Sequence, residues 1–153
     1  MYESFKELNM EDKEAFSPIL DSIIAAFKAR YGDSYFIGDY SDVDENENIK
    51  TPAIFIELTN FENAENPVRE LFRAKCTFRA YICESYRGKA KRRVRDTALD
   101  VAKFINLNTW DNRQIFTEAK FTYALEDDFN EKITSCEIWY DEWEQEVYLD
   151  NVA

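Results

Sequence analysis

The chain has 153 residues, of which 45% are hydrophobic and 16% aromatic, so it is too apolar for a disordered protein and long enough to bury a core. Its formal net charge of −12 argues against general affinity for nucleic acid or an anionic membrane. It contains no histidine, which excludes His-dependent catalytic triads and His-ligated metal sites.

The first residues are polar, and a helix is expected to follow them. We expect one domain over residues 1–153, with residues 1–16 as an N-terminal arm or short helix. Ser17 suits an N-cap, Pro18 suits the first helical position, and Gly32 can end the helix. Apolar residues then recur at three-and-four spacing, which predicts one buried stripe: Leu20, Ile23, Ile24, Phe27 and Tyr31.

Two strands are predicted after this helix. Residues 41–50 form an acidic loop, residues 51–60 alternate in polarity, and residues 60–67 form a second loop. Residues 71–85 then alternate with a cleaner period of two. One face of this strand is apolar, with Phe72, Ala74, Cys76, Phe78, Ala80 and Ile82, and the other carries Arg73, Lys75, Thr77, Arg79 and Tyr81.

A turn at Gly88 leads into a second predicted helix over residues 89–107, whose buried stripe is Val94, Ala98, Val101 and Ile105. A strand is predicted over residues 119–125, with Ala119, Phe121, Tyr123 and Leu125 on one face. The last strand covers residues 133–149, and its apolar positions change from even to odd partway. We therefore expect a β-bulge, or a crossing between packing partners, near residues 140–142.

These elements predict an α+β fold of the order α-β-β-α-β-β. An antiparallel or mixed four-stranded sheet, with both main helices packed on one face, would bury the apolar stripes.

The sequence predicts no catalytic residues, no cofactor and no metal site, so we expect that the protein is not an enzyme. The three cysteines have no metal-type spacing and are expected to be free, buried thiols in a cytoplasmic protein. The glycines are too dispersed for a phosphate-binding loop. Residues 42–53 resemble the start of a calcium loop, but Glu47 and Ala53 replace its glycine and its final glutamate.

The positive charge is concentrated in one segment. Residues 69–103 contain eleven Lys/Arg and four Asp/Glu, a net charge of +7, whereas the rest of the chain has a net charge of −19. Six of the nine residues from 87 to 95 are basic: Arg87, Lys89, Lys91, Arg92, Arg93 and Arg95. They stand at the start of a predicted helix, where cations oppose the helix dipole at a cost of roughly 0.3–1 kcal/mol each.

Two interpretations of this segment remain open. It can be a solvated face, paired internally with loops such as residues 42–47. Alternatively, it meets an acidic surface of another molecule, which would be a second copy of the chain, a separate acidic protein or nucleic acid.

The chain resembles the small tail-terminator and tail-completion (minor tail) proteins of long-tailed bacteriophages, including those of Mu-like prophages. Three segments carry the resemblance. They are the amphipathic helix of residues 19–31, the strand Thr51-Pro52-Ala53-Ile54-Phe55-Ile56-Glu57 with the long strand and helix that follow, and the closing strand of residues 139–149. In that last strand Trp143, Gln145, Val147 and Leu149 alternate.

This resemblance implies an α+β subunit of a homo-oligomeric ring, expected to be a hexamer, that caps the tail tube and joins it to the head. The implied partners are further copies of the chain and the tail-tube or head–tail connector proteins, with DNA only passing through the channel and no membrane contact. The implied location is the bacterial host's cytoplasm during assembly, and then the virion tail. The charge argument gives the candidate subunit or tube contacts: Arg73, Lys75, Arg79, Lys91, Arg92, Arg93 and Arg95. The alternative function is that of a monomeric acidic binding module, such as an inhibitor or immunity protein.

Overall fold

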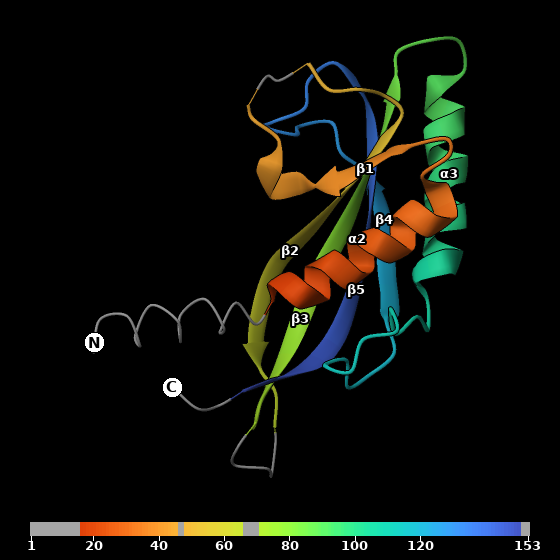
Figure 1. Ribbon diagram of the computed structural model, residues 1–153. Helices are drawn as coiled ribbons and strands as arrows, with labels where there is room; N and C mark the ends of the chain where they lie inside the picture. Colours follow the sequence, from red (N-terminus) through yellow and green to blue (C-terminus); the bar gives the residue numbers. More distant parts are fainter. Residues whose placement is uncertain (1–15, 46–47, 66–70, 151–153) are drawn as a thin grey trace.

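The computed structural model of the chain describes residues 16–45, 48–65 and 71–150 (Figure 1). The expected arm of residues 1–16 therefore lies outside the described residues except for Phe16. Neither helix in the described part is long and apolar enough to span a membrane. The elements are α2 (Ser17–Tyr31), β1 (Phe36–Asp39), a 3-10 helix (Tyr40–Asp42), β2 (Ala53–Asn63), β3 (Leu71–Ser85), α3 (Ala90–Ile105), β4 (Lys120–Glu126) and β5 (Cys136–Asp150).

The strands form one mixed sheet in the order β1-β2-β3-β5-β4. Strand β1 is parallel to β2, and every other neighbouring pair is antiparallel. This confirms the α+β class with a mixed sheet, but the expected four strands and the order α-β-β-α-β-β are wrong. Strand β1 was missed because four residues are too few to show an alternating pattern, and its neighbour β2 comes later in the chain.

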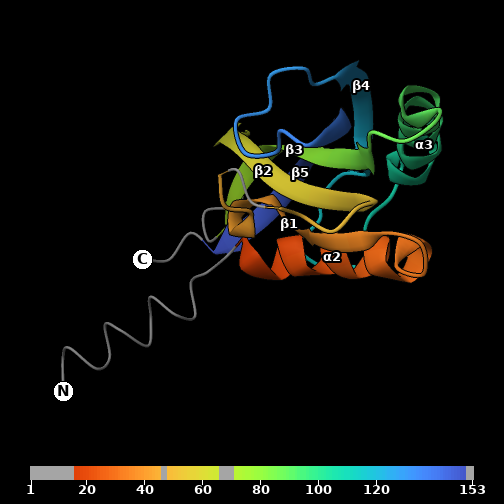
Figure 2. The ribbon, with the colours of Figure 1, turned by 90° about the horizontal axis from the view of Figure 1, so that it is seen from above.

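Both helices contribute to a single apolar core on one face of the sheet. Figure 2 shows α2 along the β1 side and α3 beside the β4 side. The predicted stripe of α3 is fully buried there. In α2 the most buried residues are Ile19, Ile23, Phe27 and Tyr31, while Leu20 and Ile24 pack at the margin. The apolar faces predicted for β2 and β3 also lie in this core, so the sequence periodicity identified the right faces.

A second, smaller core covers part of the opposite face. Here the 3-10 helix and the connection between β4 and β5 pack over the sheet, and Tyr40 stacks on Tyr81 with ring centroids 4.3 Å apart. The three cysteines are buried as expected, Cys76 in the main core and Cys83 with Cys136 in this one. The remainder of this face carries charged side chains.

The phase change in the last strand reflects a crossing between the two cores. The register between β3 and β5 is unbroken from Leu71 to Ser85. Ile138 and Tyr140 face the smaller core, whereas Trp143, Val147 and Leu149 face the helices. Of the two expected alternatives, the crossing is therefore the one that β5 adopts.

A bulge does occur opposite residues 142–143 of β5, but it lies in the neighbouring strand β4. The register shifts between Phe121 and Tyr123, and the hydroxyl of Thr122 donates a hydrogen bond to the Glu142 carbonyl at 2.8 Å. The extra residue turns Tyr123 and Leu125 to the face opposite Phe121. The expectation that all four apolar residues of this strand share one face is therefore wrong.

The helix α2 also begins differently from the expectation. Ser17 is its first helical residue rather than the N-cap, which is Phe16 without a side-chain hydrogen bond. Gly32 ends the helix as predicted, and its backbone N–H donates to the Lys28 carbonyl at 2.8 Å. Gly88 adopts a φ of +54°, as the turn before α3 requires.

Gln145 of β5 connects the sheet to the segment between α3 and β4. Its side chain is buried and accepts hydrogen bonds from the indole nitrogens of Trp110 at 2.7 Å and Trp143 at 3.3 Å. Its amide nitrogen donates to the carbonyls of Asn108 at 2.9 Å and Thr117 at 3.0 Å. The connected segment has three non-glycine residues with positive φ, at Leu107, Trp110 and Asp111. Three hydrogen bonds between the Gln145 side chain and this segment therefore hold a backbone that local preference would not select.

Replacing Gln145 with Leu is expected to lower the free energy of unfolding by about 3 kcal/mol. The substitution leaves two buried indole N–H groups and two carbonyls without this partner, each at roughly 1–3 kcal/mol if water does not replace it. Urea denaturation followed by tryptophan fluorescence measures the change. A Q145L variant within 0.5 kcal/mol of the parent would show that this network does not hold the segment.

Candidate interaction surface

The three basic side chains predicted on β3 lie on the face of the sheet without helices, and each is paired with a glutamate of β5. Arg73 donates to both carboxylate oxygens of Glu146, at 3.0 and 3.2 Å. Lys75 lies 2.7 Å from Glu144, and Arg79 lies 3.0 Å from Glu142. These ion pairs follow from the antiparallel register, in which Arg79 stands directly opposite Glu142. Arg73 and Lys75 reach Glu146 and Glu144 diagonally, each two residues from the position directly opposite.

Aromatic rings hold the two arginines further. The guanidinium carbon of Arg73 lies 3.8 Å from the centroid of the Phe116 ring, and that of Arg79 lies 4.1 Å from the Tyr140 ring. The hydrogen bond to Glu144 raises the pKa of Lys75. Arg73, Lys75 and Arg79 are thus neutralised within the chain, which supports the internal-pairing interpretation for this half of the basic segment, although the partners are β5 glutamates rather than residues 42–47.

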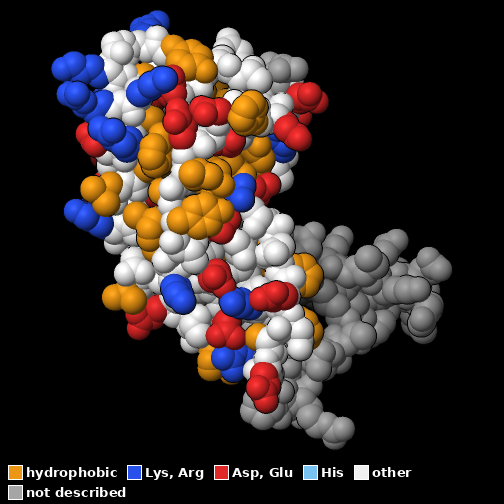
Figure 3. Space-filling view, turned by 180° about the vertical axis from the view of Figure 1, so that it is seen from behind, with side chains coloured by type: hydrophobic (Ala, Val, Ile, Leu, Met, Phe, Trp, Pro, Cys, Tyr) orange, Lys and Arg blue, Asp and Glu red, His pale blue; other side chains and the backbone are white. Residues whose placement is uncertain are grey.

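The cations of α3 are arranged differently. Figure 3 shows Lys and Arg side chains gathered at the upper left, over the beginning of this helix. Arg93 is held within the chain, since it donates to the Arg87 carbonyl at 2.9 Å and lies 3.9 Å from Glu84. The exposed side chains of Lys91, Arg92 and Arg95 make no hydrogen bond or ion pair with any part of the chain that the structure describes.

The unpaired cations share the outer face of α3 with a leucine. The inner face of the helix is its buried stripe, and Arg92, Leu99 and Lys103 follow one another on the opposite side. Leu99 is 59% exposed. Leu99 is not among the residues predicted from the sequence, although its position opposite the predicted stripe of α3 could have indicated it. We call Arg92, Arg95, Leu99 and Lys103 the outer face of α3.

The opposite edge of the sheet is acidic. Strand β1 ends at Asp39, and the following residues include Asp42, Asp44 and Glu45. Asp39 is held in place because its carboxylate accepts hydrogen bonds from the backbone N–H and the hydroxyl of Ser41, at 2.9 and 2.7 Å. In Figure 1 this segment lies on the other side of the molecule from α3. The basic start of α3 and the acidic segment after β1 therefore lie on different sides of the molecule.

A buried carboxyl group lies on the helix-covered face of β5. Asp141 is fully buried between Ala80 of β3 and Ala124 of β4, and neither carboxyl oxygen has a hydrogen-bond partner among the described residues. Burial raises its pKa to about 8. Asp141 is therefore mainly protonated at neutral pH and does not add to the acidic surface.

Elsewhere the described residues include no group of three or more His, Cys, Asp or Glu that could hold a metal ion. The expectation of a non-enzyme stays a prediction.

Comparison with known proteins assigns no family. No family model matches the chain, and no curated protein matches its sequence. The resemblance to tail proteins thus remains a hypothesis based on the residues and the order of elements.

The buried Asp141 predicts that stability falls as pH rises. Because its pKa is about 8 in the folded chain and 3.8 without burial, the folded state binds the extra proton between these values. The free energy of unfolding should then decrease by up to about 1.4 kcal/mol per pH unit. Urea denaturation at pH 6.0 and 7.5 measures this slope, in a range where the absence of histidine leaves few other groups to titrate.

The variant Asp141→Asn should remove most of this slope, while the matched surface variant Glu126→Gln should keep it. Equal slopes in D141N and the parent would show that Asp141 is ionised in the folded protein.

The two classes of cation are expected to respond differently to neutralisation. Arg79→Gln loses a half-buried ion pair and the contact with Tyr140, and should lower the free energy of unfolding by roughly 1–2 kcal/mol. Arg92→Gln, a matched change at an exposed and unpaired position, should alter it by less than about 0.5 kcal/mol. Urea midpoints compare the two variants, and similar losses would contradict the division into structural and free cations.

Proposed function

We propose that this chain is a structural assembly protein of a phage tail or a related contractile particle. Copies of it associate into a homo-oligomeric ring, expected to be a hexamer, that terminates the tail tube and joins it to the head. The observation that carries the proposal is the separation of charge across the fold: unpaired cations lie on α3, which covers β3, β5 and β4, and an acidic segment lies at the β1 edge of the sheet.

The unpaired cations favour a protein partner because they are unfavourable in the isolated chain. They lie in the first turns of α3, whose N-cap Lys89 makes no side-chain hydrogen bond. Each exposed cation there costs roughly 0.3–1 kcal/mol against the helix dipole. An acidic surface from a neighbouring molecule would offset that cost, and the chain itself offers such a surface at its other edge.

A ring follows naturally from two different complementary patches. A contact that joins one patch to a different patch on the next copy repeats in the same direction, and it closes into a ring when the rotation permits. The tail-tube and connector proteins would then bind the faces of the ring. DNA passes through the channel, and the net charge of −12 disfavours tight binding to it.

One observation favours the alternative of a monomeric acidic binding module. The connection between β4 and β5 carries Asp127, Asp128 and Glu131 around Phe129, which is 91% exposed. An acidic loop with a protruding aromatic ring could mask a basic site on a target protein. In that case the chain would remain monomeric, and the cations of α3 would be solvated.

The ring is tested by native mass spectrometry and electron microscopy of the wild-type protein at low and high salt. We expect a discrete ring at low salt that dissociates as salt screens the contact. The double substitution Arg92→Glu and Arg95→Glu should abolish the ring without unfolding the domain. Arg93 is left unchanged because it is held by Glu84 and Arg87.

The control for this variant is Arg113→Glu with Lys120→Glu, which makes the same change in net charge at exposed positions outside α3. This control should still form rings. A wild-type protein that stays monomeric at high concentration, with no ring by microscopy, would favour the binding module instead.

A further inference from the structure

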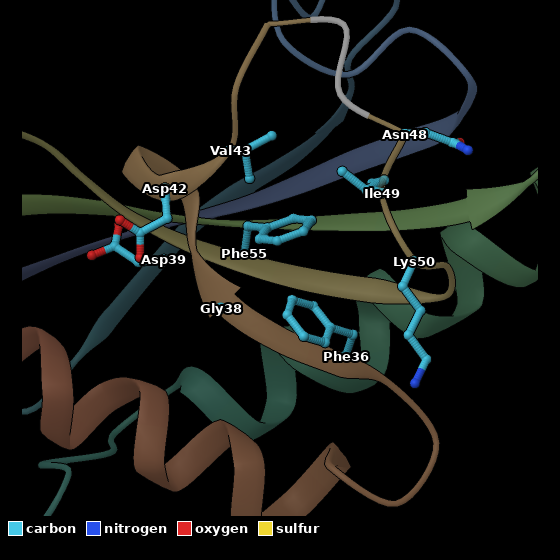
Figure 4. Close-up of a pocket in the computed structure, with 9 residues that line it drawn as sticks. All are labelled: Phe36, Gly38, Asp39, Asp42, Val43, Asn48, Ile49, Lys50 and Phe55. Carbon is cyan, nitrogen blue, oxygen red and sulfur yellow. The ribbon is translucent and has the colours of Figure 1, made fainter.

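An apolar pocket lies at the acidic edge of the sheet. Its volume is about 220 Å³, and it opens between β1, the start of β2 and the segment after the 3-10 helix. Figure 4 shows the rings of Phe36 and Phe55 directed into it, with Val43 and Ile49 above. We call it the Phe36–Phe55 pocket.

Gly38 forms the floor of this pocket. A Cβ atom at this position would lie 3.3 Å from the Phe36 ring and 3.4 Å from the Phe55 ring, so a side chain there would fill the space between the rings. Two acidic residues, Asp39 and Asp42, line the pocket on one side. The single base in the lining, Lys50, extends away from the rings (Figure 4). The pocket is therefore apolar inside and acidic at its rim.

The outer face of α3 has the opposite character. Leu99 protrudes from it, and the three cations Arg92, Arg95 and Lys103 surround the leucine along the helix. Two carboxylates of α3 are also exposed: that of Asp96, and that of Asp100, which lies 3.8 Å from Arg30. An isolated exposed leucine needs no explanation by itself. Here, however, the leucine lies within a basic surface on the helix that covers β3, β5 and β4, and an apolar pocket with an acidic rim lies at the β1 edge of the sheet.

We propose that Leu99 of one copy inserts into the Phe36–Phe55 pocket of the next copy, with Arg92 and Arg95 facing the rim carboxylates of Asp39 and Asp42. This contact rests on the proposed function, because it specifies how the copies associate. The contact is heterologous, because the leucine and the pocket lie on different surfaces of each chain. Every dimer therefore has one leucine and one pocket that are still available.

A second copy fits the pocket better than an unrelated ligand because shape and charge are complementary at once. The leucine supplies an apolar anchor that is excluded from water, which is where interfaces gain most of their affinity. The surrounding ion pairs supply orientation and attract the correct edge. The leucine without the cations would leave a desolvated carboxylate at the rim without a partner. The cations without the rim carboxylates would stay exposed and unpaired.

The test uses two variants that each damage one half of the contact. Leu99→Glu removes the anchor and keeps the pocket, whereas Gly38→Leu fills the pocket and keeps the anchor. Each variant alone should be monomeric by native mass spectrometry and light scattering. Mixed in equal amounts they should form a dimer of two 18.1 kDa chains and nothing larger, because only one intact contact remains.

Leu125→Glu is the control for the anchor, since it places the same charge at another exposed leucine, on β4, and rings should persist. If circular dichroism shows that Gly38→Leu does not fold, Asp42→Lys takes its place at the exposed rim. The inference is overturned if either half-variant still forms rings, or if the mixture stays monomeric or forms rings. A wild-type monomer would reject the proposed function as well, whereas rings in L99E would reject only this contact.

Discussion

The pairing of β3 with β5 is the interaction on which the other parts of the structure depend. The two strands are antiparallel in unbroken register over fifteen residue pairs. On the helix-covered face this register stacks Phe78 on Trp143, with ring centroids 5.3 Å apart, at the centre of the main core. On the other face it sets arginines and a lysine against glutamates. This one register therefore positions the core residues of both strands. It also brings the cations of β3 within reach of the glutamates that neutralise them.

This neutralisation changes the meaning of the charge asymmetry in the sequence. The segment of residues 69–103 carries a net charge of +7, but the fold divides its cations into two groups. The cations of β3 are paired with glutamates that lie about sixty to seventy positions later in the chain. The cations at the start of α3 remain largely unpaired within the described residues, apart from Arg93. Among the described residues, the cations that remain available to an acidic partner therefore lie on the helix rather than on the strand.

The sequence predicted the long, regular elements well and the short or irregular ones poorly. Strand β3 and the buried stripe of α3 were found because fifteen or more residues keep one period. Strand β1 has four residues, and the bulge at Thr122 inverts the pattern of β4, so neither gives a readable signal. Ser17 lies inside the helix although its residue type favours an N-cap, because a cap depends on backbone geometry and not on residue type alone.

The candidate surface was predictable only in part, because a sequence shows clustered charge but not the contacts that form on folding. Clustered charge is visible in a sequence, so the cations of α3 were found. Their pairing is not visible, because the partners of Arg73, Lys75 and Arg79 come from a register that forms only in the sheet. The Phe36–Phe55 pocket was likewise invisible, since its lining joins a short parallel strand, a glycine floor and a loop separated along the chain.

The position of these features across the sheet explains why charge and apolar contacts are both needed. Strands β2, β3 and β5 lie between the acidic edge strand β1 and the other edge strand β4, and α3 packs across β3, β5 and β4. In the proposed contact, opposite charges attract two copies, but they do not define one relative orientation, because screened ion pairs tolerate many orientations. A single protruding leucine and a single pocket fix the position, but they are too small to bring the copies together selectively. A ring of defined size requires both, since every contact must repeat with the same rotation for the last copy to meet the first.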